Sequence, residues 1–379
     1  MKSHAVRSLS VVAALAAAGA PGLLLAAEPA APAAAPAVPS WTDMLAAWGL
    51  TANGYVAGSY YASNGYPSNI HQFDIQHDTF QLDQAGLVVA YQPKTGFGAL
   101  VDVFAGEDAR ILNEAESGSG DRSVFDIRQA FLQYATGPLT VIAGKYVTLA
   151  GAEVINPTQN TNFSRSLIFT WSEPLTHTGV RATWALSDTV SLIGGINNGW
   201  NVMSTSYGPK TGEAGIAWTP NKTFSLATQA YLGKTQQFDG ERALIDVVAT
   251  YNATSALTLI LNFDWDQQQF ATGPSASWNG AALYVNYAFN GAWRLSVRGE
   301  YLDDKDGFNF GGRGQTLKEG TVTVGYAPVK NFELRFEGRY DRGQDAIFFR
   351  TNPNPNAANV ELADSLSEIA LQGVYKFGT

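Results

Sequence analysis

Few side chains in this sequence are grouped in a way that suggests chemistry, and each group has a simpler structural explanation. The chain contains no cysteine, which excludes a disulfide scaffold, a Cys-ligated zinc or iron–sulfur site and a Cys nucleophile. His71 and His77, with Asp74 and Asp78 beside them, suggest a metal ion, but their spacing in a polar segment is not specific for one. We therefore expect these histidines to lie in a solvated loop.

Two other groups of residues suggest a hydrolase or a calcium site, but the sequence around them supports neither. Ser172, His177 and Asp188 would supply a hydrolytic triad, but no nucleophile-elbow motif surrounds the serine. Residues 303–307 (DDKDG) resemble part of a calcium-binding loop, yet Gly314 stands where such a loop carries its last glutamate. We expect no catalytic residue, no metal site and no cofactor, and hence a protein that is not an enzyme.

Basic side chains at alternating positions are the more informative set. They are Arg181, Arg294, Arg298, Arg335 and Arg339. Acidic residues alternate with these arginines and would neutralise them in local ion pairs. The acidic residues are Glu300, Glu333, Glu337 and Asp341. The alternative is a basic patch that orients or attracts anionic solutes. Both interpretations depend on the elements that carry these residues.

The composition of the 379 residues favours β-structure. Charged residues make up 15%, against roughly 25% in an average soluble protein, while glycine supplies 38 positions and aromatics 12%. Lysine and arginine number 24 against 33 aspartates and glutamates, so nucleic acid is not an expected partner. The mean hydropathy is −0.08, and no internal apolar run approaches about 20 residues, which excludes a helical membrane bundle.

The N-terminal part of the chain has a different composition from the rest. Residues 1–27 have the features of a secretory signal peptide. Two basic residues, Lys2 and Arg7, are followed by an apolar stretch and then by small residues at the expected cleavage site. Residues 28–48 predict an Ala/Pro-rich periplasmic linker that ends in a short amphipathic segment. Residues 49–379 form the predicted membrane domain.

Beyond the linker, apolar and polar residues alternate in segments of 8–12 residues, which is the period of a β-strand. Phe332, Leu334 and Phe336, for example, are separated by charged residues. Each such segment has one apolar face and one face of charges and amides. Two segments, at 126–134 and 139–148, alternate less cleanly, and their faces are not assigned. The clearest segments are 257–266, 293–301, 332–341 and 368–377.

The connections between these segments alternate between short turns and long polar loops. Short turns rich in Gly, Pro, Asn and Asp lie at 93–96, 137–138, 187–188, 220–222, 253–255, 290–291 and 328–330. Long loops lie near 63–77, 106–122, 150–175, 200–210, 235–241, 268–277, 303–316 and 344–364. This order predicts an all-β protein: a transmembrane, antiparallel up-and-down β-barrel of about 16 strands with short periplasmic turns and long extracellular loops.

Aromatic side chains provide an independent test of the barrel. Many lie near a short turn or the C-terminus, among them Tyr91, Trp218 and Tyr375, while Trp265 and Tyr301 lie near long-loop ends. Two bands of amphipathic rings are expected where a barrel crosses the two membrane interfaces. A soluble β-sandwich would bury its apolar face and needs no such bands, and a propeller would show a repeated blade signature.

Four short segments carry a further signal, namely 144–146 (GKY), 151–155 (GAEVI), 173–180 (EPLTHTGV) and 197–200 (NNGW). Together they resemble the OmpL-like β-barrel porins, most densely between 140 and 200 and more loosely over the whole barrel. The resemblance implies a channel in the outer membrane of a Gram-negative bacterium. The chain departs from the usual outer-membrane pattern because it ends on Gly-Thr rather than on an aromatic residue.

A barrel of this size is too wide for side chains to fill, so water is expected inside. We therefore predict an outer-membrane porin for passive diffusion of small hydrophilic solutes or ions, with selection by radius and wall charge. The alternatives are a solute-specific channel and a structural or adhesive anchor that displays its loops. Expected partners are the lipid bilayer and the solutes, and a homotrimer remains open.

The third long loop, about residues 150–176, is too apolar for a loop that lies free in solvent, which is the ordinary fate of such loops. Burial is worth about 25 cal/mol per Å² of apolar area, which favours folding the loop into the barrel. Glu153 and Arg165 are then expected to face Lys145 and Arg181 and to form an eyelet of opposed charges. The candidate constriction and lumen residues are Lys145, Glu153, Arg165, Arg181, Arg294, Arg298, Arg335 and Arg339.

Overall fold

The computed structural model describes residues 40–67, 70–117, 123–205, 208, 210–234, 240–350 and 360–378. The predicted signal peptide and most of the predicted linker lie outside the described residues, as do parts of the predicted loops at 63–77, 106–122, 200–210, 235–241 and 344–364. Among the described residues, no helix is long and apolar enough to cross a membrane.

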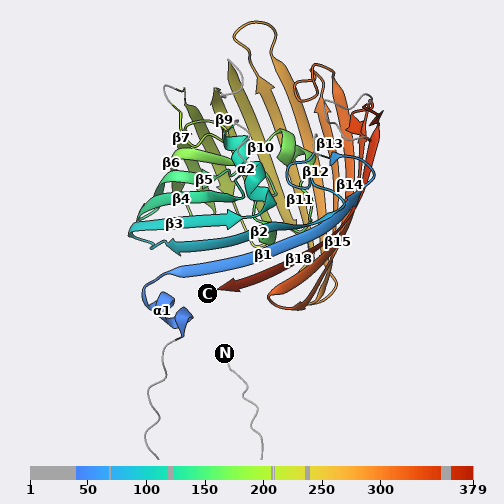
Figure 1. Cartoon of the computed structure of the whole chain (residues 1–379). Helices are drawn as coiled ribbons and strands as arrows, with labels where there is room; N and C mark the ends of the chain where they lie inside the picture. Colours follow the sequence, from blue (N-terminus) through green and yellow to red (C-terminus); the bar gives the residue numbers. More distant parts are fainter. Residues whose placement is uncertain are drawn as a thin grey trace, which may run out of the picture. The chain divides into compact units, whose positions relative to one another are not determined.

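Within the described part of the chain, sixteen strands form one closed antiparallel barrel, which confirms the predicted fold (Figure 1). Closure comes from pairing of the first strand, β1 (Thr51–Ser63), with the last, β18 (Ser365–Gly378). The strands between them are β2 (Thr79–Tyr91), β3 (Gly96–Ala105), β4 (Phe125–Thr136), β5 (Leu139–Val147), β6 (Thr176–Ala185), β7 (Val190–Asn197), β8 (Thr211–Trp218), β9 (Phe224–Lys234), β10 (Glu241–Asn252), β11 (Leu257–Gln268), β12 (Ala276–Ala288), β13 (Trp293–Asp304), β14 (Gln315–Val329) and β15 (Phe332–Gly343).

The remaining elements are short. β16 (Phe348–Phe349) and β17 (Leu362–Ala363) form a small separate sheet. The helices are α1 (Trp41–Ala47), which covers the predicted amphipathic segment, α2 (Glu107–Ser117), α3 (Leu167–Trp171) and the 3₁₀ turn η2 (Pro157–Gln159).

All seven predicted short turns join neighbouring barrel strands, and all lie within the described residues. In four of these turns a side chain accepts a hydrogen bond from a backbone N–H group that follows it. Asn221 accepts hydrogen bonds from the backbone N–H groups of Thr223 and Phe224, and Gly137 has a φ of 55°, which favours glycine. We call this end of the barrel the short-turn end.

The strands present their apolar faces outward, as the alternation predicts. In β11, Leu261 and Phe263 are 48% and 40% exposed. The side chains that alternate with them, Asn262 and Asp264, are fully buried in the interior of the barrel. An apolar outer surface matches the hydrocarbon of a bilayer, where a closed barrel also leaves no backbone hydrogen bond unmade. The less regular strand β4 follows the same rule, because Leu132 is exposed.

The described parts of three long connections fold into the barrel, and we call these connections L1 (residues 64–78), L2 (106–124) and L3 (148–175). They share one apolar cluster with the wall. Its buried members are Phe73 from L1, Ala109, Ile111 and Leu112 from α2 in L2, Ile155, Phe169 and Leu175 from L3, and Phe104 from β3. Side chains of the loops, and not water alone, therefore occupy a large part of the interior.

Candidate functional site

L3 crosses the interior of the barrel and packs against the wall opposite its own strands. Leu167 and Ile168 of α3 are fully buried in a cluster with Trp278 and Leu302 of β12 and β13. Gly280 of β12 makes this approach feasible, because a Cβ atom there would lie 2.3 Å from Cγ2 of Ile168. The apolar residues that distinguish L3 in the sequence are the ones that hold it inside.

Wall carboxylates accept hydrogen bonds from the backbone of L3. Glu337 of β15 accepts from the N–H groups of Phe163 and Ser164 at 2.7 and 2.9 Å. Glu300 of β13 accepts from the N–H of Leu167 at 2.7 Å. Buried backbone donors need such partners, so these two glutamates fix the path of the loop.

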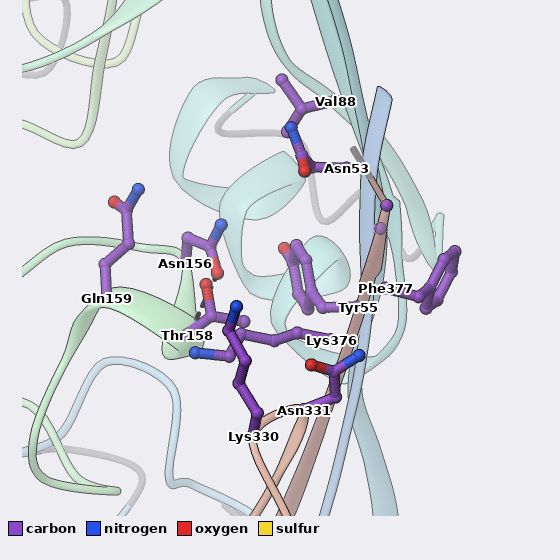
Figure 2. Close-up of a pocket in the computed structure, with 12 residues that line it drawn as sticks. Asn53, Tyr55, Val88, Asn156, Thr158, Gln159, Lys330, Asn331, Lys376 and Phe377 are labelled. Atoms are coloured by element: carbon purple, nitrogen blue, oxygen red, sulfur yellow. Dashed lines mark hydrogen bonds between the residues drawn. The ribbon is translucent and has the colours of Figure 1, made fainter. Parts of the chain in front are cut away.

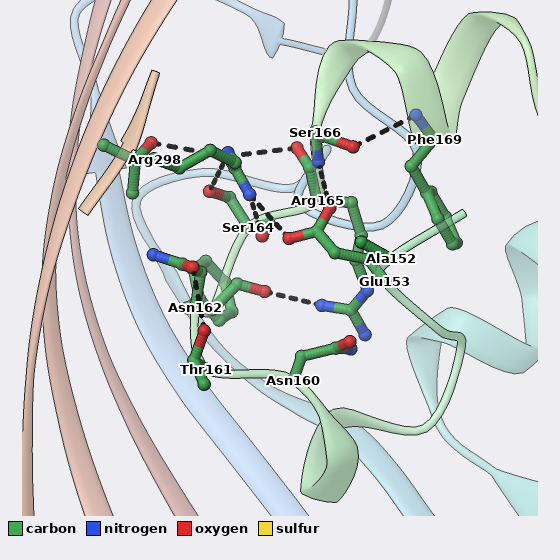
Figure 3. A network of polar contacts seen from close by, with 12 residues as sticks. Ala152, Glu153, Asn160, Thr161, Asn162, Ser164, Arg165, Ser166, Phe169 and Arg298 are labelled. Atoms are coloured by element: carbon green, nitrogen blue, oxygen red, sulfur yellow. Dashed lines mark hydrogen bonds and ion pairs between the residues drawn. The ribbon is translucent and has the colours of Figure 1, made fainter. Parts of the chain in front are cut away.

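Arg298 of β13 is the centre of the polar network between L3 and the wall (Figure 3). Its side chain is fully buried. It donates to Glu153 at 2.8 Å and to the carbonyl of Ser164 at 2.9 Å, both in L3. On the wall it pairs with Glu300 at 2.9 Å and Glu319 at 3.2 Å. One guanidinium thus joins three carboxylates, which is favourable in a buried site only while every partner is present.

The other predicted lumen arginines on β13 and β15 are also paired with neighbouring acidic residues. Glu333 accepts from Arg294 at 2.6 Å and from Arg335 at 2.9 Å. Arg339 pairs with Asp341 at 2.8 Å. The structure therefore shows the local ion pairs, not a free basic patch. Two of these arginines also reach L3: Arg294 donates to the carbonyl of Thr161, and Arg339 donates to that of Arg165.

The structure does not bring Glu153 and Arg165 to Lys145 and Arg181 as the predicted eyelet requires, because all four residues have other partners. Glu153 pairs with Arg298, as described above. Arg165 donates to the carbonyls of Val154, Phe163 and Ile155 within L3 itself. Its guanidinium also lies over the ring of Phe73, 5.5 Å from the centroid.

The two wall cations have other partners, each supplied by a neighbouring element. Lys145 binds Glu116 of α2 at 2.7 Å and Asp126 of β4 at 3.0 Å. Arg181 of β6 pairs with Glu213 of β8 at 2.9 Å. A buried cation takes the carboxylate that the fold places beside it, and the sequence does not indicate that α2 enters the barrel.

His71 is buried, in contrast to the solvated loop that the sequence predicts. Its Nδ1 lies 2.7 Å from Asp74, and its Nε2 lies 3.2 Å from Asp341 of β15. Burial and Arg339 act to lower the pKa of His71, but the carboxylates of Asp74, Glu368 and Asp341 together raise it to about 10. The imidazolium therefore ties L1 to the wall at neutral pH.

A cavity of about 500 Å³ opens between the tip of L3 and the short-turn end (Figure 2). Lys330, from the turn between β14 and β15, and Lys376 of β18 extend into it, opposite Asn156 and Gln159 of L3. No carboxylate is among its described lining residues. We call it the vestibule. The sequence did not predict this cavity. Its one signal is Lys376, which the alternation of the last strand places on the inward face.

Comparison with known proteins shows where this architecture belongs. A comparison with curated protein sequences gives no match. Solved structures share the fold at low identity. The loop L8 deletion mutant of OmpT from Vibrio cholerae has a TM-score of 0.60 at 12% identity, over 86% of this chain and 99% of that chain. An anion-selective porin from Comamonas acidovorans has a TM-score of 0.59 at 12% identity, over 86% and 99%. OprB from Pseudomonas putida has a TM-score of 0.60 at 13% identity, over 88% and 96%.

A family model provides the assignment that these distant structures cannot. The model described as beta-barrel porin-2, OmpL-like, matches residues 49–368, which is nearly the whole barrel. The match confirms the resemblance found in residues 140–200, and it accounts for the closed barrel with an apolar outer surface. This chain belongs to the OmpL-like beta-barrel porin-2 family and is a porin of the outer membrane.

Proposed function

We propose that the protein is a non-enzymatic channel for passive diffusion of small hydrophilic solutes, in which L3 forms the constriction. The observation that carries this proposal is the course of L3, which is buried inside the barrel and hydrogen-bonded to the opposite wall. Four of the predicted lumen residues, Arg294, Arg298, Arg335 and Arg339, would then hold the constriction in place, because each donates a hydrogen bond to a group of L3. Glu153 and Arg165 belong to L3 itself, and Lys145 and Arg181 would stabilise the wall.

A narrower, solute-specific channel is the second candidate. It is favoured by the shared apolar cluster of L1, L2 and L3, which fills interior space that a general pore would leave to water. Single-channel recording in a planar bilayer separates the candidates. Large ohmic steps indicate a general pore, current that one class of solute blocks indicates a specific channel, and a silent bilayer contradicts both.

The vestibule suggests a preference for anions at the short-turn end. Replacing Lys330 and Lys376 together by glutamine is expected to shift the reversal potential in a salt gradient toward cations, because two positive charges leave a cavity without carboxylates. Lys94, in an exposed turn at the same end, provides the control. If Lys94→Gln shifts the potential equally, the vestibule does not determine ion selectivity.

The even strand number returns the chain to its starting side, so both ends of the barrel chain lie at the short-turn end. We propose that the short turns are periplasmic and the long loops extracellular. Because the chain has no cysteine, single cysteines report accessibility cleanly. Arg313→Cys in a long loop is expected to react with a bulky, impermeant maleimide on intact cells, and Lys222→Cys in a short turn only after permeabilisation. The reverse result would invert the topology.

Two further parts of the proposal concern the mature protein. We propose that residues 1–27 are removed on export and that residues 28–48 form a periplasmic linker, which N-terminal sequencing of the membrane-inserted protein would test. We also propose a homotrimer, supported by a structurally similar OmpT from Vibrio cholerae, which is described in a trimer form. Light scattering of the detergent-solubilised protein would give the subunit number.

A further inference from the structure

Three buried carboxylates meet where the end of L3 approaches the wall. Asp246 of β10 and Asp264 of β11 stand directly opposite each other in the strand register. Glu173 reaches them from L3. One oxygen of each carboxylate lies within 4.8 Å of the others. Asp246 and Asp264 are fully buried, and Glu173 is 6% exposed.

Glu173 points into this pair without a partner of its own. Neither of its carboxylate oxygens has a hydrogen-bond partner among the described residues, and the same is true of Oδ1 of Asp246 and Oδ2 of Asp264. The other oxygens of the two aspartates accept from the amide of Asn262, at 2.8 and 3.3 Å. Four buried carboxylate oxygens therefore lack a donor in the described structure.

The nearby cation does not neutralise the group. Arg242, on the same strand as Asp246, pairs with Asp266 at 3.5 Å. Burying uncompensated charge is costly, so the cluster needs either protons or a cation.

Gly151 of L3 packs directly against the carboxylate of Glu173. A Cβ atom at this position would overlap the carboxylate, and Gly151 has a φ of 88°, which favours glycine. A larger residue here would displace Glu173 from its place beside the two aspartates.

We propose that Glu173, Asp246 and Asp264 bind a divalent cation of the Ca²⁺ type, which ties the end of L3 to the wall. Hard cations take oxygen ligands, and Ca²⁺ binds them at about 2.3–2.6 Å, so two oxygens on one ion can lie about 5 Å apart. The observed span fits this range. Mg²⁺ binds its ligands at about 2.0–2.1 Å and usually keeps several waters, so a site made wholly of protein carboxylates favours Ca²⁺. This site goes beyond channel function, and it departs from the absence of metal that the sequence predicts.

Calcium binding can be measured without any transport assay. The purified, EDTA-treated barrel in detergent is titrated with CaCl₂ by calorimetry at pH 8, and its thermal midpoint is recorded with and without Ca²⁺. We expect saturable binding of one ion per chain and a higher midpoint with Ca²⁺. Because changes to outer-shell groups alone cost 10–100-fold in metal affinity, Glu173→Gln is expected to weaken Ca²⁺ binding by about tenfold or more.

Asp303→Asn, in the DDKDG segment, is the matched control, and its calcium affinity is expected to equal that of the wild type. Should Glu173→Gln fail to fold, Asp246→Asn carries the same expectation. The proposal is overturned if the wild type binds no stoichiometric Ca²⁺, or if Glu173→Gln binds it as tightly as the wild type. It is also overturned if the midpoint responds to pH but not to Ca²⁺, since protons alone would then neutralise the cluster.

Discussion

Deleting residues 158–164 is expected to raise the single-channel conductance several-fold. These residues include most of η2 and the stretch that follows it up to Arg165, and they carry contacts that hold the loop across the lumen. Asn162 donates to Thr323 at 2.6 Å, and the backbone of Phe163 donates to Glu337 at 2.7 Å. Without the segment, the loop loses these contacts with the opposite wall, and the open cross-section is expected to increase. Conductance in a planar bilayer at a fixed salt concentration is the measurement.

A short deletion in an exposed loop is the appropriate control for this experiment. Residues 271–274, in the connection from β11 to β12, are all exposed. Their removal leaves three residues to join the two strands and is expected to leave the conductance at the wild-type value. If both deletions change the conductance equally, or if the L3 deletion leaves it unchanged, L3 is not the constriction.

Replacing Arg298 by methionine is expected to lower the free energy of unfolding by about 3–5 kcal/mol, because it leaves a buried ionic cluster without its cation. Glu153, Glu300 and Glu319 would remain close together in a buried site with no guanidinium between them. The carbonyl of Ser164 would also lose its donor. Urea unfolding in lipid vesicles, followed by tryptophan fluorescence, measures the loss.

Arg342→Met provides the comparison on a neighbouring part of the wall. Arg342 pairs with Asp364 at 3.3 Å, but its side chain is 61% exposed. Exposed ion pairs contribute about 0–1 kcal/mol, so this variant is expected to unfold almost as the wild type does. Equal losses for the two variants would show that burial of the Arg298 cluster does not matter for stability.

The strand pattern and the turns are features that the sequence determines by itself. The alternation of Leu261, Asn262 and Phe263 places each side chain on one face of β11, because successive residues of a strand point to opposite sides. Turn residues such as Asn221 act on backbone groups two or three positions away. These signals are local, and a bilayer admits few folds that satisfy every backbone group, so the barrel and its strand number could be predicted.

The charge partners inside the barrel were decided by the tertiary structure alone. Glu153 and Arg298 are far apart in the chain, as are Glu173 and Asp246, and no spacing rule relates such positions. Their contacts depend on the path of L3, which is set by apolar burial against β12 and by the space at Gly280. In a buried interior each charge must be compensated by whatever lies within a few ångströms, and closure of the barrel and entry of the loops determine which groups those are.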